Sequence, residues 1–120
     1  MAREKPSGRP RTRVLIADDH PVMRRGLREL LADSGDCTVV GEATRGDEVE
    51  AALVATPCDV IVLDLGMPGV QGFELVEAVH RSHSALPIIV LSMHPEEQFG
   101  VRALRAGASA YLTKESAPDE

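Results

Sequence analysis

Aromatic residues are nearly absent from this chain of 120 residues, which has two phenylalanines, one tyrosine and no tryptophan. The core must therefore be aliphatic, and a surface that stacks nucleic-acid bases on aromatic rings is excluded. Long apolar runs are missing too. None approaches the roughly 20 residues of a membrane-spanning helix, and no apolar stretch typical of a secretory signal follows the N-terminus. With 43% hydrophobic and 27% charged residues, the composition is that of a globular domain.

Cysteine is scarce as well, because Cys37 and Cys58 are the only two. They lack the CxxC or Cys/His spacing of a zinc site, and two cysteines do not make a disulfide framework. This usage favours a reducing, cytoplasmic location.

Basic residues are concentrated at one end of the chain. Residues 1–13 contain five basic residues and one acidic residue, whereas the rest of the chain contains 8 basic and 18 acidic residues. We expect residues 1–12, which are rich in Pro, Gly, Ser and Arg, to form a disordered basic tail, either a solvated leader or a nucleic-acid arm. The acidic body at 13–120 argues against direct DNA binding, because phosphate contacts need clustered lysine and arginine.

Short apolar runs alternate with segments of helical periodicity from Val14 onward. Runs such as 60–63 are continuously apolar, which is typical of strands buried on both faces of a parallel sheet. The alternation predicts an α/β fold with right-handed crossovers. The predicted strands are 14–17, 38–43, 60–63, 87–93 and 110–113, and the predicted helices are 21–34, 46–56, 72–83 and 95–106.

Helical periodicity also predicts which side chains face the core. It places Val22, Leu27 and Leu30 on the inner face of the first helix, and Leu104 on the inner face of the last. Five strands with four helices leave one sheet face incompletely covered, and residues 115–120 look like the start of a fifth helix that is mostly lacking. Apolar side chains of the first and fifth strands would then be exposed, which predicts a homodimer or low stability.

Polar residues follow the carboxyl ends of four predicted strands: Asp18 with Asp19, then Asp64, Ser92 and Lys114. Open parallel sheets bind ligands at this edge. A lone aspartate after a strand is usually a turn or cap residue, but that explanation is poor for the whole set. Carboxylates brought close together repel one another unless a cation lies between them, and an open oxygen-lined site suits Mg²⁺.

Asp64 is the best candidate for a nucleophile in this set. The Gly- and Pro-rich loop after it leaves its face open. A carboxylate beside a metal ion, an ammonium and a hydroxyl can position a phosphoryl group and neutralise its charge. The expected product is an acyl phosphate on Asp64.

These stretches resemble the receiver domain of bacterial two-component response regulators. Residues 14–20 (VLIADDH) resemble its first strand and acidic pair, and residues 60–68 (VIVLDLGMP) resemble its phosphorylation strand and loop. Residues 88–92 and 110–114 resemble the strands that carry its switch hydroxyl and its lysine. The stretches DDHP, DLGMPG and LTKE are most similar to NarL/FixJ-type regulators. The resemblance implies a flavodoxin-like (CheY-like), doubly wound sheet of five parallel strands in the order 2-1-3-4-5.

The resemblance also implies roles for the acidic residues. Asp64 would accept phosphate from a sensor histidine kinase, using Mg²⁺ held by Asp18, Asp19, Asp64 and the backbone carbonyl of Gly66. Such a domain is not otherwise an enzyme, because it catalyses only its own phosphorylation and dephosphorylation. Full-length members control transcription through a C-terminal helix-turn-helix domain, which these 120 residues do not include.

Five residues receive further roles from the resemblance or from their position. Ser92 and Lys114 would bind phosphoryl oxygens, and Tyr111 would move inward as Ser92 moves, unless it is only a core residue. Gly66, which has no side chain over the site, and His94 would set how water reaches the acyl phosphate and therefore its lifetime. His94 could instead be an ordinary surface histidine.

Three other functions remain as alternatives. A haloacid-dehalogenase-type hydrolase also uses an aspartate after a strand, but it needs a second aspartate where Gly66 stands. A flavodoxin needs a hydroxyl-rich phosphate loop where this chain has DDHP. A receiver that works without phosphorylation is the third alternative. His20, beside the acidic pair, is interpreted as structural because neutral imidazole is a poor partner for Mg²⁺.

Overall fold

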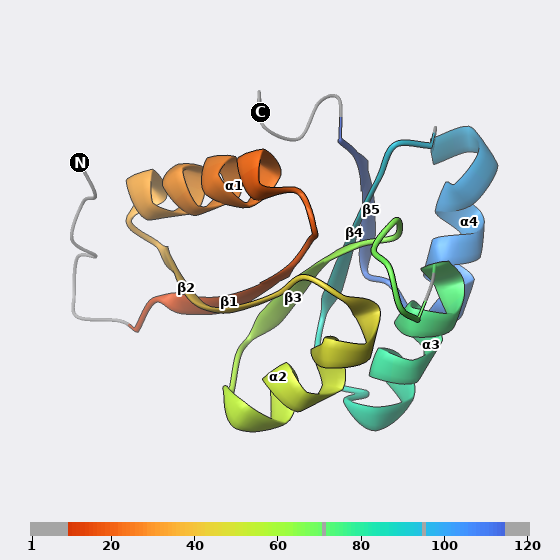
Figure 1. The fold of residues 1–120 in the computed structure, drawn as a ribbon, viewed down its shortest axis with the longest axis horizontal. Helices are drawn as coiled ribbons and strands as arrows, with labels where there is room; N and C mark the ends of the chain where they lie inside the picture. The colour runs from red at the N-terminus through yellow and green to blue at the C-terminus, as the bar shows by residue number, and fades with distance from the viewer. Residues whose placement is uncertain (1–9, 71, 95, 115–120) are drawn as a thin grey trace.

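The computed structural model describes residues 10–70, 72–94 and 96–114, with side chains from 96 to 98 left out. Five strands and the helices between them alternate along the described chain (Figure 1). The strands are β1 (Thr12–Ala17), β2 (Cys37–Ala43), β3 (Val60–Asp64), β4 (Ile88–Ser92) and β5 (Ala110–Thr113). The helices are α1 (Pro21–Ser34), the 3₁₀ turn η2 (Gly46–Glu48), α2 (Val49–Ala55), α3 (Gly72–Ser82) and α4 (Glu96–Ala106).

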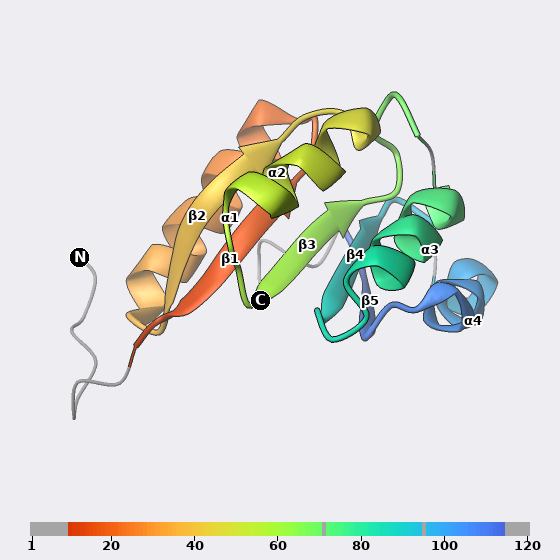
Figure 2. The same cartoon turned by 90° about the horizontal axis from the view of Figure 1, so that it is seen from below.

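The sheet is fully parallel, and its strand order is β2-β1-β3-β4-β5, as the resemblance implies. Helix α1 covers one face of the sheet, and α2, α3 and α4 cover the other (Figures 1 and 2). Because every strand runs the same way, all five carboxyl ends lie at one edge. The order reverses beside β1, which makes the crevice between β1 and β3 the expected ligand position of this topology.

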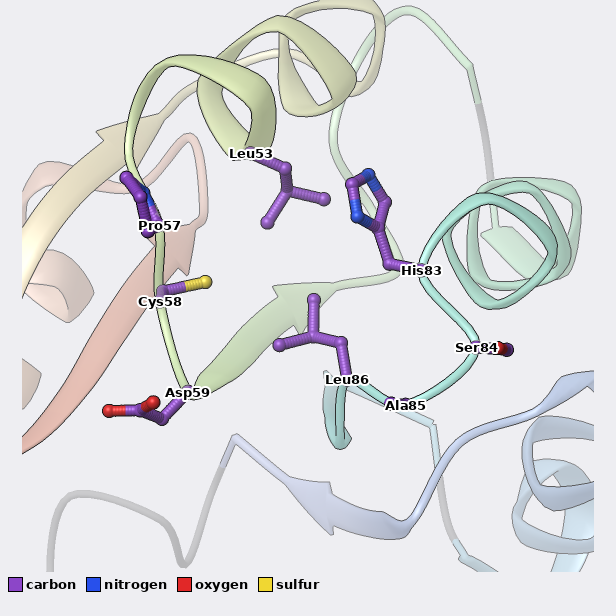
Figure 3. A pocket seen from close by; sticks show the side chains of 8 residues that line it. All are labelled: Leu53, Pro57, Cys58, Asp59, His83, Ser84, Ala85 and Leu86. Carbon is purple, nitrogen blue, oxygen red and sulfur yellow. The ribbon is translucent and has the colours of Figure 1, made fainter.

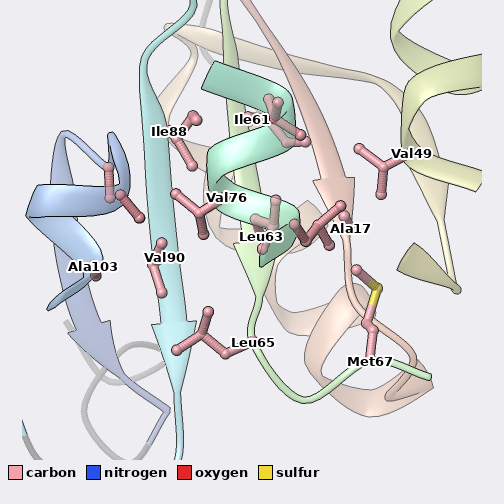
Figure 4. Close-up of a cluster of buried hydrophobic side chains, with 14 of the residues drawn as sticks. Ala17, Val49, Ile61, Leu63, Leu65, Met67, Val76, Ile88, Val90 and Ala103 are labelled. Atoms are coloured by element: carbon pink, nitrogen blue, oxygen red, sulfur yellow. The ribbon is translucent and has the colours of Figure 1, made fainter. Parts of the chain in front are cut away.

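Two aliphatic cores lie on the two faces of the sheet. On the α2–α3–α4 face, Leu63 and Val90 are fully buried against Val76 of α3 (Figure 4). On the α1 face, Val14 and Ile16 pack with Leu27. The central strands β1, β3 and β4 therefore contribute alternate residues to each core, which explains why they are almost continuously apolar.

The ends of α1 are set by local residues. Pro21 stands at its first turn, where the missing N–H is not needed. Gly35 follows it with φ 76°, a left-handed conformation that glycine adopts without strain, and its N–H binds the carbonyl of Ala32. This helix begins and ends where the sequence predicts.

The predicted helix 46–56 is divided in the structure, because η2 precedes α2. Gly46 lies against the loop that follows β3, where a Cβ would be 2.2 Å from the carbonyl oxygen of Val70. Its N–H donates to the carbonyl of Pro68 at 2.7 Å. Only glycine permits this approach, and the contact anchors the loop that begins after Asp64.

Several predictions of buried side chains were wrong. Val22 and Leu30 of α1 and Leu104 of α4 are exposed, because only part of each apolar stripe faces the sheet. The predicted exposure of the first strand was also wrong, since Val14 and Ile16 are buried beneath α1. In the fifth strand Leu112 is exposed, as expected.

Two predictions concern residues that the structure does not describe. The basic tail falls mostly within residues 1–9, although β1 begins at Thr12, the last residue assigned to that tail. The fifth helix falls within residues 115–120. Among the described residues, no helix is both long enough and apolar enough to cross a membrane.

Candidate functional site

Four strands deliver polar residues to the carboxyl edge of the sheet. Asp18 directly follows β1, Asp64 and Ser92 are the last residues of β3 and β4, and Lys114 directly follows β5. All four are buried, with at most 7% of their surface exposed. They are the buried polar or charged residues found in the described part of the chain. The structure therefore brings together side chains that are up to 96 positions apart in the sequence.

The three residues at the ends of β1, β3 and β4 make the same local turn. In each, a side-chain oxygen accepts a hydrogen bond from the backbone N–H two residues later. Asp18 Oδ1 accepts from residue 20 at 2.8 Å, Asp64 Oδ1 from residue 66 at 2.9 Å, and Ser92 Oγ from residue 94 at 3.0 Å. Asp and Ser favour this turn because their short side chains reach the backbone. The turn fixes each side chain and commits only one oxygen of each carboxylate.

The second oxygen of each carboxylate has no hydrogen bond. Asp18 Oδ2 and Asp64 Oδ2, together with Asp19 Oδ1, are buried without a hydrogen-bond partner. Lys114 Nζ provides the nearby positive charge, at 2.9 Å from Asp64 Oδ2 and 3.4 Å from Asp18 Oδ2. Two of the three carboxylates thus share one ammonium, which leaves the cluster with an excess of negative charge.

Burial raises the pKa of the Asp64 carboxyl above its ordinary value, and the negative charge of Asp18 adds to this effect. The Gly66 N–H and Lys114 act in the opposite direction but do not outweigh burial. An added cation beside Asp64 Oδ2 would favour the ionised carboxylate.

The residues fit a divalent cation. Asp18, Asp19, His20 and Asp64 each offer one ligand atom, and these atoms all lie within 4.8 Å of one another. Carboxylate oxygens with no hydrogen-bond donor are the ligands that a hard cation such as Mg²⁺ prefers. The sequence also predicts a ligand at the carbonyl of Gly66, an exposed residue whose N–H is used by Asp64.

The switch candidates lie beside this cluster. The Lys114 N–H donates to the Ser92 carbonyl at 2.8 Å, which joins the ends of β5 and β4. Tyr111 is buried, and its hydroxyl donates to the carbonyl of His94 at 2.7 Å. The ring of His94 contacts that of Phe99, with centroids 4.4 Å apart. The side chain of Tyr111 is therefore already inside the molecule, bonded to the backbone two residues beyond Ser92.

The contacts that two residues, His20 and Arg24, make at the site were not predicted from the sequence. His20 Nδ1 lies 2.9 Å from Lys114 Nζ and 3.0 Å from Asp18 Oδ1. Arg24, in the first turns of α1, donates to the carbonyl of Asp18 at 2.8 Å and also pairs with Glu42. Because His20 directly follows the acidic pair in the sequence, its place at the site could have been predicted. Nothing in the sequence indicates the contacts of Arg24.

A cavity of about 520 Å³ opens at the other edge of the sheet (Figure 3). Cys58 and His83 lie at its wall, with Leu53 and Leu86. None of the residues that line it belongs to the acidic cluster. The chemistry predicted from the sequence thus belongs to the carboxyl edge and not to this cavity.

Comparison with known proteins matches residues 14–120 to the response regulator receiver domain. The nitrate/nitrite response regulator protein NarL of Escherichia coli (strain K12) is 39% identical over 108 residues, which cover 89% of this chain and 50% of NarL. The crystal structure of a two-component response regulator of the LuxR family from Aurantimonas sp. SI85-9A1 has a TM-score of 0.84 and 35% identity, and the match covers 92% of this chain and 79% of that one.

A structure of RcsB from Salmonella enterica serovar Typhimurium, bound to promoter rprA in the presence of phosphomimetic BeF₃⁻, is also similar. Its TM-score is 0.81 and its identity 29%, with 88% of this chain and 61% of that chain covered. The chain spans about half the length of the curated relatives that it matches.

Proposed function

The chain belongs to the response regulator receiver domain family, in its NarL/FixJ type, and from this premise we propose that Asp64 is its phosphoacceptor. The observation that carries the proposal is the state of Asp64 Oδ2. This oxygen is buried, takes no part in the turn with Gly66, and faces the ammonium of Lys114 at 2.9 Å. It is the nucleophile that phosphoryl transfer to a carboxylate needs.

Asp18, Asp19, Asp64 and the carbonyl of Gly66 would hold Mg²⁺. The ion would neutralise charge on the phosphoryl oxygens during transfer. The turns at residues 18 and 64 keep one oxygen of each carboxylate oriented toward the ion. Arg24 assists by holding the carbonyl of Asp18, which limits movement of the backbone at the end of β1.

Transfer to Asp64 follows from these positions. An oxygen of Asp64 attacks the phosphorus of a phosphohistidine on a sensor kinase; the P–N bond breaks, a P–O bond forms, and the histidine nitrogen takes up a proton. The Lys114 ammonium, which pairs with the Asp64 carboxylate before the transfer, then pairs with the phosphoryl group. Water later attacks the same phosphorus, which releases phosphate and the free carboxylate. Gly66 and His94 flank the route of that water and set the lifetime of the acyl phosphate.

Phosphorylation would shift the molecule between two arrangements. The Ser92 oxygen accepts from the N–H of His94, and its hydroxyl hydrogen would turn to donate to a phosphoryl oxygen. That movement pulls on the carbonyl of His94, to which the Tyr111 hydroxyl is bonded. The new contacts exist only in the phosphorylated state, so they bias the population toward it. The position of the Tyr111 side chain would therefore change with the shift between the two arrangements.

The same proposal covers the partners. A sensor histidine kinase would donate the phosphate, and a C-terminal DNA-binding output domain would pass the switch to transcription, in keeping with the promoter-bound RcsB structure. A homodimer and a cytoplasmic location also belong to this proposal. The exposed Leu112 and the two unpaired cysteines, Cys37 and Cys58, support them.

Acetyl phosphate with Mg²⁺ tests the proposal directly. We expect the intact mass of the protein to increase by one phosphoryl group, and we expect no increase with Asp64→Ala or when the metal is chelated. Asp59→Ala is the matched control, because Asp59 stands at the other end of β3, and it should be phosphorylated like the wild type. An increase that persists in Asp64→Ala would overturn the assignment.

A further inference from the structure

His20 Nδ1 lies among charged groups of both signs. The ammonium nitrogen of Lys114 is 2.9 Å away. The carboxylate oxygens are at 3.0 Å for Asp18 Oδ1, 3.3 Å for Asp19 Oδ1 and 3.7 Å for Asp64 Oδ2. The side chain of His20 is 58% exposed, so packing does not force the ring into this position.

One ring nitrogen cannot satisfy these neighbours together. If Nδ1 carries a proton, it donates to a carboxylate but opposes the N–H groups of Lys114. If Nδ1 is bare, it accepts from Lys114 but directs its lone pair at Asp18 and Asp19. A cation that takes the place of the Lys114 ammonium at Nδ1 would remove the conflict, because the carboxylate oxygens and a bare Nδ1 would then all donate electron pairs to it.

The spacing of these atoms agrees with a common metal. Ligands about 2.1 Å from an octahedral ion are about 3.0 Å apart when they are adjacent. Nδ1 is 3.3 Å from Asp19 Oδ1 and 3.7 Å from Asp64 Oδ2, whereas its 3.0 Å contact is with Asp18 Oδ1, the oxygen that the local turn already uses. Independently of His20, Asp18 Oδ2, Asp19 Oδ1 and Asp64 Oδ2 are buried without a hydrogen bond. The cluster therefore has both the vacant acceptors and the spacing that a bound ion requires.

We propose that His20 Nδ1 is an additional ligand of this site and makes it selective for first-row transition-metal ions, such as Mn²⁺ or Ni²⁺, over Mg²⁺. The inference rests on the divalent-ion site proposed above and adds a nitrogen to its oxygen ligands. Imidazole nitrogen suits transition metals, whereas Mg²⁺ is bound almost entirely by oxygen. His20 thus determines which ion the carboxylates retain, and its role is more than structural.

Pulsed EPR of the Mn²⁺-loaded wild-type protein gives the direct test. We expect a ¹⁴N coupling from a directly bound imidazole, and we expect it to change to a ¹⁵N coupling when histidine is labelled with ¹⁵N. The coupling should disappear in His20→Ala and persist in His83→Ala. His83 is the matched control because it lies at the other edge of the sheet, paired with Glu50.

Metal titrations provide a second readout. The ratio of Ni²⁺ to Mg²⁺ affinity should fall by at least about tenfold in His20→Ala and should not change in His83→Ala. If wild-type protein binds Mn²⁺ without any ¹⁴N coupling, or if it binds no Mn²⁺, the inference is wrong. This result is independent of whether His20→Ala folds. Phosphorylation by acetyl phosphate with Mg²⁺ is assayed in parallel, so that loss of the nitrogen ligand alone leaves the function of Asp64 supported.

Discussion

The two ends of β3 each carry an aspartate, and the two carboxylates have opposite surroundings. Asp59, just before the strand, is exposed and receives three hydrogen bonds from Arg13 at 2.8, 3.2 and 3.1 Å. The Arg13 side chain and N–H lower the pKa of the Asp59 carboxyl. Asp64, five residues later, is buried with an oxygen that accepts no hydrogen bond, and burial raises its pKa.

The difference between the surroundings of Asp59 and Asp64 indicates which edge of the sheet holds the functional site. At the amino edge an aspartate and an arginine satisfy each other in solvent. At the carboxyl edge Asp18 and Asp64 share Lys114 and Asp19 lies beside them, so negative charge is left over. An aspartate beside a buried strand is therefore not sufficient; Asp64 differs from Asp59 because it is buried and shares its basic partner with a second carboxylate.

Removing the basic partner of Asp64 or of Asp59, at the two ends of β3, should give the largest difference in the free energy of unfolding. Lys114→Met leaves Asp18 and Asp64 buried without their ammonium, and we expect a loss of about 3 kcal/mol in the free energy of unfolding without metal. Arg13→Met leaves Asp59 solvated by water, so its loss of stability should be much smaller. Urea unfolding in the presence of a chelator measures both. Equal losses would remove the distinction between the two edges.

Mg²⁺ should stabilise only through the carboxyl edge. At an ion concentration ten times Kd, binding to the folded state adds about 1.4 kcal/mol to the free energy of unfolding. We expect this gain in the wild type and in Asp59→Asn, and a clearly smaller gain in Asp64→Asn. Urea unfolding with and without Mg²⁺ provides the measurement. A full gain in Asp64→Asn would place the ion elsewhere.

Neutralising the two aspartates should change stability in opposite directions. Because the folded pKa of Asp64 is raised, its charge opposes folding above that pKa, and the penalty disappears as the pH falls below it. Metal-free Asp64→Asn should thus be more stable than wild type at pH 7 by on the order of 1 kcal/mol. The gain should shrink as the pH is lowered.

Asp59→Asn should behave in the reverse manner. The folded pKa of Asp59 is lowered, so its favourable contribution is present above the unfolded pKa and is lost as the pH falls through the folded pKa. A small loss of stability at pH 7 that vanishes in acid is expected. Urea unfolding from pH 3 to pH 7 follows both variants, and a loss for Asp64→Asn at pH 7 would contradict the account.

The smallest effect should come from a neutral group at the carboxyl edge. Tyr111→Phe removes only the hydroxyl that donates to the carbonyl of His94. We expect a loss of about 0.5–1 kcal/mol, the usual contribution of a hydrogen bond between neutral groups, and no change in Mg²⁺ affinity. A loss as large as that of Lys114→Met would mean that charge is not what sets this edge apart.

The sequence predicts the strands and their ends better than the helix surfaces. Continuously apolar runs identify the central strands β3 and β4, because these strands are buried on both faces. An apolar stripe does not say how wide the covered face of a helix is, so Val22 and Leu104 were assigned to the core although they are exposed. The turn η2 depends on the approach of Gly46 to residues 68–70, which no local pattern encodes.

Part of the candidate site could also be predicted from the sequence, and part could not. Strand ends of a parallel sheet meet at one edge, so the neighbourhood of Asp18, Asp64 and Lys114 follows from the element pattern and the family resemblance. The contact between His20 and Lys114 joins residues 94 positions apart and depends on side-chain orientation. The same holds for Arg24, which the helix turns back onto the end of β1. Such contacts require the packed structure.

The central claim, that Asp64 and no other carboxylate accepts the phosphoryl group, has one most direct test. Protein treated with acetyl phosphate and Mg²⁺ is reduced with borohydride, which converts an aspartyl phosphate to homoserine, and the modified residue is located by peptide mass spectrometry. The account predicts homoserine at position 64. Homoserine at 18, 19 or 59 with an unmodified Asp64 would contradict it.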